Sequence, residues 1–76
     1  MSTSQQARQL LAEATNCAVL SIPDDVRIGQ FAAWDSLAHL RLIVRIEEAI
    51  GRQLDPDETV RIESLAEIAA LITSTA

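Results

Sequence analysis

Residues 34–51, WDSLAHLRLIVRIEEAIG, contain the pattern that decides the fold. Asp35 is a good N-cap residue, and Ser36 follows it as the expected first residue of a helix. Gly51 stands where a C′ glycine would end that helix, so the stretch predicts a helix over residues 36–50. Backbone N–H groups at a helix start lack intrahelical partners, and the helix dipole favours negative charge there. Ser36 is therefore a natural place to carry a phosphate, and we interpret it as an attachment point rather than a nucleophile.

The apolar residues of this helix fall on two sides when each residue is placed at about 100° per step. The first side suits a core and carries Leu42, Ile43, Ile46 and Ile50. The second side carries Leu37, Leu40 and Val44, and the remaining face carries Arg41, Arg45 and Glu48. The apolar arc spans roughly 200°, about twice the width found on an ordinary surface helix. Either the helix is central and its neighbours cover both sides, or the second side faces cargo or a partner protein.

A long connection precedes the central helix. Thr3 and Gln6 have the spacing of a capping box, which predicts a first helix over residues 4–15. The connection then covers residues 16–35, and connections of this length are often functional. Its apolar residues need burial, so it is expected to pack against the helices and to allow a short helical turn. These residues are Val19, Leu20, Ile22, Val26, Ile28 and Phe31.

Two further helices are expected after Gly51. Asp55 can cap a helix that starts at Pro56, and Glu58 follows the cap by three residues, which predicts a short helix to about Ile62. Ser64 and Glu67 form a second capping-box match that opens a last helix to about Thr73. The inward face of this helix is expected to contain Leu65, Ile68, Ala69 and Ile72. The predicted fold is all-α, a small four-helix bundle of three long helices and one short helix with a long first loop.

Composition limits the partners that this chain can have. Its 76 residues suffice for a single domain, 1–76, and its net charge is −5 with no lysine. An acidic chain is a poor nucleic-acid binder, because affinity for nucleic acid depends on neutralising phosphates. We therefore expect basic protein partners and no nucleic acid. A monomer is expected because the two long flanking helices show single narrow apolar stripes.

The sequence contains no membrane or catalytic signal. No stretch is long and apolar enough to span a membrane, and the N-terminus does not resemble a secretory signal. Cys17 is the only cysteine, which fits a reducing cytosol, so we expect a cytoplasmic protein. Cys17 itself is interpreted as a small buried hydrophobe. A metal-ligand cluster, a glycine-rich phosphate loop and a nucleophile–base pair are all missing, which predicts that the chain has no catalytic residues and no metal and is not an enzyme.

The chain resembles the acyl carrier proteins over nearly its whole length. The triplet Asp35-Ser36-Leu37 matches the attachment motif of that family, in which the serine carries 4′-phosphopantetheine. The match continues through the Ile/Leu/Val-rich helix, Glu47-Glu48 near its end, the short acidic third helix and a fourth helix from Ser64. The resemblance implies a covalent 4′-phosphopantetheine cofactor, taken from coenzyme A and attached to Ser36, with Asp35 and Leu37 beside it.

The resemblance also implies a function. The chain would be a freestanding acyl carrier protein that holds acyl groups as thioesters on the arm, for fatty-acid or polyketide-type biosynthesis. Its partners would be a phosphopantetheinyl transferase and the acyl-loading and acyl-processing enzymes. Two alternatives stay open at this point. One is a peptidyl or aminoacyl carrier of the same fold, and the other is a helical interaction subunit whose Ser36 is never modified.

The partner surface departs from the family pattern. Acidic residues usually line the second helix in this family, whereas Ala38, Arg41 and Arg45 interrupt that face here, which favours a dedicated pathway. Trp34 either packs against the loop or marks the partner surface, and His39 is interpreted as a solvated or half-buried residue. The residues expected at the docking surface are Trp34, Leu37, Leu40, Arg41, Val44, Arg45, Glu47 and Glu48.

Overall fold

The computed structural model describes residues 3–75, apart from the side chain of Thr75. It is all-α in this range, as predicted, with four α-helices and one 3₁₀ turn. The elements are α1 (Thr3–Thr15), η1 (Val19–Ser21), α2 (Ser36–Ile50), α3 (Pro56–Val60) and α4 (Leu65–Thr75). None of the described helices is long and apolar enough to cross a membrane.

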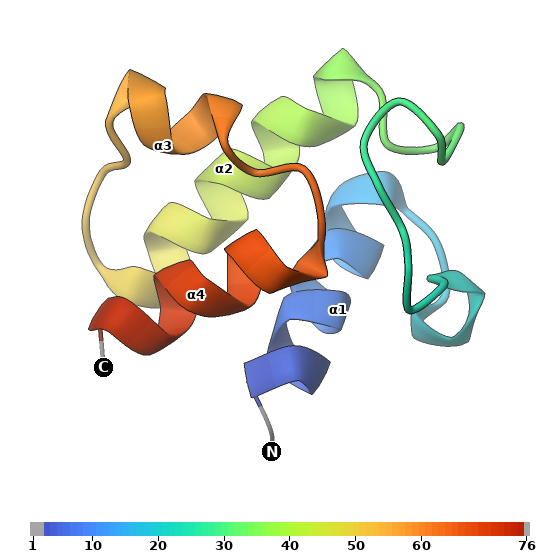
Figure 1. Ribbon diagram of the computed structural model, residues 1–76, viewed down its shortest axis with the longest axis horizontal. Coiled ribbons are helices and arrows are strands. Elements are labelled where there is room, and N and C mark those ends of the chain that lie inside the picture. The colour runs from blue at the N-terminus through green and yellow to red at the C-terminus, as the bar shows by residue number, and fades with distance from the viewer. Residues whose placement is uncertain (1–2, 76) are drawn as a thin grey trace.

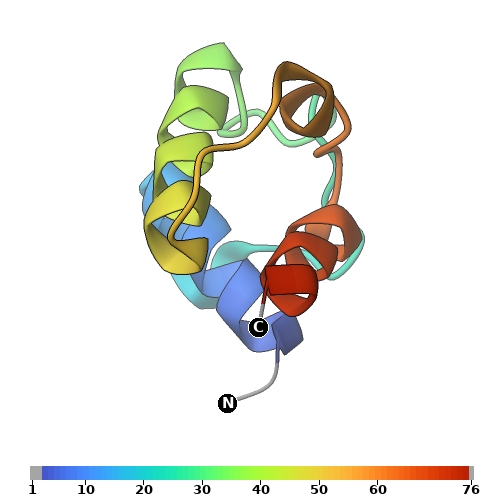
Figure 2. The ribbon, with the colours of Figure 1, turned by 90° about the vertical axis from the view of Figure 1, so that its left-hand side faces the viewer.

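α1 is the platform of the fold, because it packs against both α2 and α4. In Figure 2, α2 lies on one side of the molecule and α3 and α4 lie on the other, with α1 below and between them. The long loop that connects α1 to α2 occupies the right-hand side of Figure 1. This arrangement leaves the outer face of α2 on the surface, away from α3 and α4.

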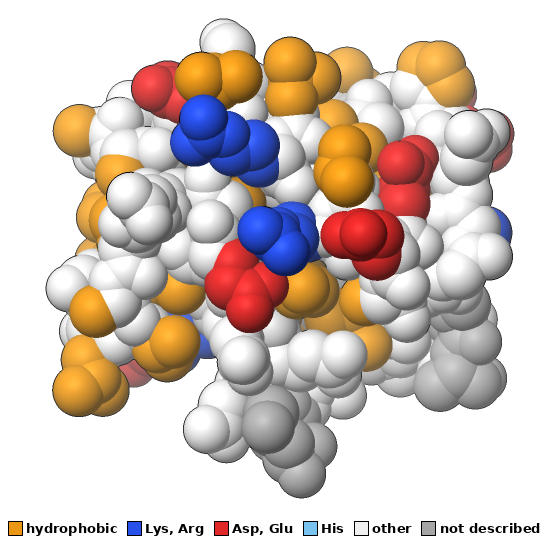
Figure 3. Space-filling model, turned by 180° about the vertical axis from the view of Figure 1, so that it is seen from behind, with side chains coloured by type: hydrophobic (Ala, Val, Ile, Leu, Met, Phe, Trp, Pro, Cys, Tyr) orange, Lys and Arg blue, Asp and Glu red, His pale blue; other side chains and the backbone are white. Residues whose placement is uncertain are grey.

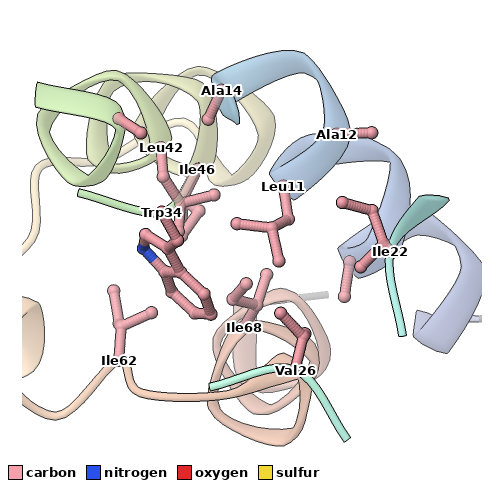
Figure 4. Packing of buried hydrophobic residues seen from close by; sticks show 12 residues of the cluster. Leu11, Ala12, Ala14, Ile22, Val26, Trp34, Leu42, Ile46, Ile62 and Ile68 are labelled. Carbon is pink, nitrogen blue, oxygen red and sulfur yellow. The ribbon is translucent and has the colours of Figure 1, made fainter. Parts of the chain in front are cut away.

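The core forms where α1, α2, α4 and the loops meet (Figure 4). Its largest fully buried side chains are Leu11, Ile22, Trp34, Leu42, Ile46, Ile62 and Ile68. Burial of each side chain of this size contributes on the order of 1.5–3 kcal/mol. Leu42 and Ile46 are four residues apart and therefore share one face of α2. The prediction that this face is the core side is confirmed.

Local signals set both ends of α2. Asp35 has an extended backbone, and its Oδ1 accepts a hydrogen bond from the backbone N–H of Ala38 at 2.8 Å. At the other end Gly51 adopts a left-handed φ of 76°, and its N–H donates to the carbonyl of Glu47. A residue with a Cβ rarely adopts this conformation, so glycine is the favoured residue at this position. The predicted bounds, residues 36–50, are confirmed.

Trp34 anchors the start of α2 from inside the core. It immediately precedes the cap residue, and only 1% of its surface is exposed. Its Nε1–H donates to Nδ1 of His39 at 3.1 Å, and Nε2 of His39 lies 3.0 Å from the carbonyl oxygen of Thr59. Because indole only donates and a carbonyl only accepts, these bonds require the His39 tautomer with its proton on Nε2. The pair therefore joins the first turn of α2 to α3.

The first loop packs only in part. Ile22 and Val26 are buried as expected, but Val19 is 36% exposed and Leu20 is 98% exposed. The expectation of burial is wrong for these two residues. The turn η1 is the expected short helical turn, and a 3₁₀ turn directs successive side chains about 120° apart, so only one side of it can face the core. Ile22, directly after the turn, takes that place.

Polar contacts tie the same loop to its neighbours. Arg8 of α1 donates to the carbonyl of Ile22 and pairs with Asp24. Further along, Arg27 pairs with Glu63 at 2.9 Å, and the N–H of Ile28 donates to the carbonyl of Glu63 at 2.9 Å. The loop is therefore held between α1 and the start of α4.

α3 contains no buried residue, and polar contacts hold it in place. It begins at Pro56 as predicted but ends at Val60 rather than near Ile62, whose buried side chain joins the core beyond the helix. The N–H of Asp55 donates to Glu58 at 2.9 Å. Arg52 donates two hydrogen bonds to the carboxylate of Glu58, at 3.0 and 2.9 Å.

The start of α1 and the end of α4 also differ from the predictions, whereas the start of α4 directly after Ser64 is confirmed. Thr3 already belongs to α1 and is not its N-cap, and the residue before it lies outside the described residues. α4 begins at Leu65 and continues to Thr75. The carboxylate of Glu67 accepts from the Ser64 hydroxyl at 2.9 Å and from the N–H of Glu63 at 3.1 Å. The predicted inward face is confirmed, with Ile68 buried and Leu65, Ala69 and Ile72 packed against the core.

The Arg52–Glu58 pair predicts a pH dependence of stability. The hydrogen bonds from Arg52, and after them the one from the backbone N–H of Asp55, lower the pKa of Glu58 from 4.5 to about 2. A carboxylate whose pKa is lower in the folded state stabilises the fold above its unfolded pKa, and this stabilisation is lost as the pH falls. We therefore expect the free energy of unfolding of the wild type to fall between about pH 4.5 and pH 2. Glu58→Gln should lose this part of the slope in urea unfolding series, and an unchanged slope would contradict the assignment.

The Trp34–His39 bond predicts energetic coupling. His39→Leu leaves the buried indole N–H without an acceptor, so it should lower the free energy of unfolding by about 2 kcal/mol. In a Trp34→Phe background the orphaned donor is absent, and the same change should cost less than about 1 kcal/mol. Chemical denaturation of the four proteins in this double-mutant cycle measures the coupling. Equal costs in both backgrounds would show that the bond does not contribute.

Candidate functional site

Ser36 is exposed at the N-terminal end of α2. Its hydroxyl forms no hydrogen bond with the described part of the chain. The carboxylate of Asp35 occupies the N–H of Ala38, and helix geometry leaves the N–H groups of Ser36 and Leu37 without intrahelical acceptors. These donors and the positive end of the helix dipole favour an anion beside Ser36. The site therefore offers an accessible hydroxyl in surroundings suited to a phosphate ester.

An exposed apolar stripe begins beside Ser36 and follows α2. Leu37, Leu40 and Val44 are 57%, 61% and 54% exposed, so no described element covers them. The fold therefore covers only the core side of α2. Neighbouring helices do not account for the second apolar side. Exposed apolar side chains that lie together in this way often mark an interaction surface.

Charged residues border the stripe on the side of α1. Arg41 and Arg45, together with Val44, Glu48 and Glu13, line a shallow groove between α1 and α2. Arg45 lies 4.0 Å from Glu13, whereas Arg41 is exposed and forms no ion pair with any described residue. Figure 3 shows the molecule from behind, with hydrophobic, basic and acidic side chains interspersed on this face. The face is therefore mixed in charge and not uniformly acidic.

Two of the expected docking residues are engaged inside the fold. Trp34 is buried and bonded to His39, so the expectation that it is an exposed aromatic on the partner surface is wrong. Its ring fills the space before α2 where His39 provides an acceptor for the indole N–H. Glu47 is half-buried, and its Oε2 accepts from the N–H of Leu54 at 2.8 Å, so its carboxylate is partly engaged within the fold. Glu48 is exposed.

The structure does not build a catalytic centre from the groups near Ser36. His39 is half-buried, and Trp34 and Thr59 occupy both of its ring nitrogens. Cys17 is partly buried at the edge of the core, with Sγ 3.5 Å from the carbonyl oxygen of Thr15. Within residues 3–75, no three His, Cys, Asp or Glu side chains gather as a metal site. The chemistry available at Ser36 is therefore that of an exposed alcohol.

Sequence reasoning missed three features around the site. It did not pair His39 with Thr59, which is twenty residues away, or Glu47 with the backbone of Leu54. It also did not single out Val60, which is 72% exposed on α3. The sequence signal for the Trp34–His39 bond was weak, because a buried indole N–H needs an acceptor but the sequence did not show that Trp34 is buried.

Comparison with known families bears on this geometry. A family model described as a phosphopantetheine attachment site matches residues 5–72, which covers α2, α3 and most of α1 and α4. Comparisons with curated proteins and with solved structures found no match. Domains of the matched family carry covalently attached 4′-phosphopantetheine and are typically not catalytic themselves. The chain belongs to the phosphopantetheine attachment site family, and it is therefore a carrier protein.

Proposed function

We propose that Ser36 is the residue that carries the 4′-phosphopantetheine arm, and that the chain transports acyl groups as thioesters on that arm. The observation that carries the proposal is the position of Ser36, exposed at the first residue of α2 and within the matched residues 5–72. A phosphopantetheinyl transferase would supply the arm from coenzyme A. The Ser36 oxygen attacks the phosphorus of the phosphopantetheine and gives up its proton, while the pyrophosphate bond of coenzyme A breaks and adenosine 3′,5′-bisphosphate leaves.

The other described serines fit this role less well. Ser4 is exposed in the first turn of α1, but it lies outside the matched residues 5–72. The hydroxyl of Ser64 bonds to Glu67, and that of Ser74 bonds to the carbonyl of Leu71. Ser21 is exposed, but it ends the short turn η1 and does not begin a helix. Ser36 combines exposure, a helix start and a neighbouring apolar stripe, and this combination supports the assignment.

The residues around Ser36 fit a phosphate ester. The free N–H groups of the first turn and the positive end of the dipole stabilise a negative group on the hydroxyl. Asp35 keeps the first turn in place through its bond to Ala38, and the Trp34–His39 pair anchors that turn to the core. The arm supplies the thiol on which acyl groups are carried. The protein supplies a fixed attachment point and a docking surface, which raise the effective concentration of the cargo at a partner enzyme.

We further propose docking of partner enzymes on the stripe of Leu37, Leu40 and Val44. An enzyme that acts on Ser36 must cover the first turn of α2, and the stripe continues from that turn. Leu37 is the neighbour of Ser36, and Leu40 lies about one helical turn beyond it. Burial of such side chains at an interface makes binding more favourable, and it requires no change in the fold.

The proposed pathway is fatty-acid or polyketide-type biosynthesis in the cytoplasm, with acyl cargo. The acidic balance of the chain and the Asp35-Ser36-Leu37 triplet support acyl over aminoacyl loading. Parallel loading trials with acyl and aminoacyl donors separate these two classes of cargo.

The attachment site predicts a specific covalent mass change. Incubation with coenzyme A and a broad-specificity phosphopantetheinyl transferase should raise the intact mass by one phosphopantetheine. Ser36→Ala should show no gain, because it lacks the hydroxyl that accepts the arm. Ser21→Ala is the matched control and should gain the arm like the wild type.

Intact-protein mass spectrometry distinguishes the outcomes. A wild type that never gains mass would contradict the carrier assignment and would favour an unmodified interaction subunit. A Ser36→Ala protein that still gains the arm would show that the arm is attached to another residue. Circular dichroism of each variant should show unchanged helix content, which excludes unfolding as the cause of a lost modification.

A further inference from the structure

We propose that the transferase that acts on Ser36 docks on α2 through an acidic rim around an apolar recess. Leu37, Leu40 and Val44 enter the recess, and Arg41 pairs with carboxylates on the rim. The proposal rests on the proposed function, because it concerns the enzyme that attaches the arm. The proposed partner surface is apolar where it meets the stripe and acidic where it meets Arg41.

The position of Arg41 places it inside such an interface. It lies about 7.5 Å along the helix axis from Ser36 and about 40° around the axis from Leu37. A standard interface covers about 800 Å² on each partner, so an enzyme centred on Ser36 covers the first turns of α2. Arg41 is exposed, and it has no hydrogen bond or ion pair to any described residue that docking would have to break.

The whole chain carries −5, but the charged side chains near Ser36 differ in whether the fold already engages them. The carboxylate of Asp35 is directed into the helix start, where it accepts from Ala38. Glu47 is bonded to the backbone of Leu54, so its charge is partly satisfied within the fold. Glu48 is exposed but lies about 18 Å along the axis from Ser36. On the first two turns of α2, Arg41 is therefore the exposed charged side chain that has no hydrogen bond or ion pair to a described residue.

Arg45 lies about one turn beyond Arg41 and 4.0 Å from Glu13, a separation at which an exposed pair contributes little. Both arginines lie on the α1 side of the apolar stripe, in a groove that Glu13 and Glu48 also line. The stripe separates them from Ser36, so one partner can contact the apolar side chains and the arginines while it reaches the hydroxyl.

Desolvation decides which partner fits. A guanidinium that is covered by an apolar or basic surface loses its hydration without gaining a counter-charge, which is strongly unfavourable. Carboxylates on the rim satisfy it, and they also raise the association rate when they lie at the edge of the interface. The overall negative charge opposes an acidic partner, but charges more than about 8 Å away are screened at physiological ionic strength. At that ionic strength the charges closest to the interface, Arg41 among them, therefore decide the electrostatic part of docking, whereas burial of the apolar stripe supplies most of its free energy.

Charge reversal at Arg41 tests the proposal. The measured quantity is kcat/KM for arm transfer from coenzyme A onto the chain by the transferase of its own host. Arg41→Glu should lower kcat/KM about tenfold at low ionic strength, mainly through KM, because it places a carboxylate against the acidic rim. Added salt should shrink the difference. Arg41→Lys keeps the charge and should retain at least about a third of the wild-type value.

Arg61→Glu is the matched control. Arg61 is exposed and also forms no ion pair with a described residue, but it caps the end of α3 and so lies on a different element from the stripe. The Arg61→Glu substitution changes the net charge by the same amount as Arg41→Glu and should leave kcat/KM within about twofold of the wild-type value. Equal melting temperatures for the variants and the wild type show that the fold is unchanged.

The outcomes separate the two proposals. A loss in Arg41→Glu with little change in Arg61→Glu supports the acidic rim. Equal effects of the two reversals, or a higher kcat/KM for Arg41→Glu, would overturn it while leaving Ser36 as the attachment point. A wild type that receives no arm from the host transferase would overturn the proposed function, and the docking inference with it.

Discussion

The position of Ser36 depends on the anchoring of Trp34 in the core. A buried indole is tolerated only when its N–H finds an acceptor, and the Nδ1 of His39 on the next turn provides one at 3.1 Å. His39 can accept at Nδ1 because its Nε2–H is directed to the carbonyl of Thr59. The bond therefore holds the start of α2, with Ser36 on it, against both the core and α3. The cap by Asp35 then sets the residue at which the helix begins.

α2 has two different apolar sides, and the separation between them accounts for the proposed function. Leu42 and Ile46 bind the helix to α1 and the core, which fixes the attachment point in space. Leu37, Leu40 and Val44 contribute nothing to that core and remain exposed. Exposed apolar residues of this size are costly for solubility, so their position beside Ser36 supports a docking role. Arg41 adds a charge requirement that distinguishes among partners.

Much of the fold could be predicted from the sequence, because its strongest signals are local. Asp35 and Gly51 define α2 through capping and a left-handed turn, and Pro56 defines the start of α3. The features that could not be predicted depend on residues far apart in the chain. Periodicity could not show that Trp34 is buried, since that depends on the space that α4 and the Ile62 segment leave for it. The bond between Glu47 and Leu54 likewise forms only after the chain turns at Gly51. The exposed Leu20 shows the same limit, because its hydrophobicity predicted burial, whereas a 3₁₀ turn directs it to solvent.

The central claim is that Ser36 is the attachment point for the arm. Fragmentation mass spectrometry of the protein purified from its native host tests this claim most directly, because it locates the modification on the chain and reports any cargo on it. The account predicts a phosphopantetheine, free or acylated, on the peptide that contains Ser36 and on no other residue. A native protein whose Ser36 is unmodified, or whose arm lies on a different residue, would contradict the account.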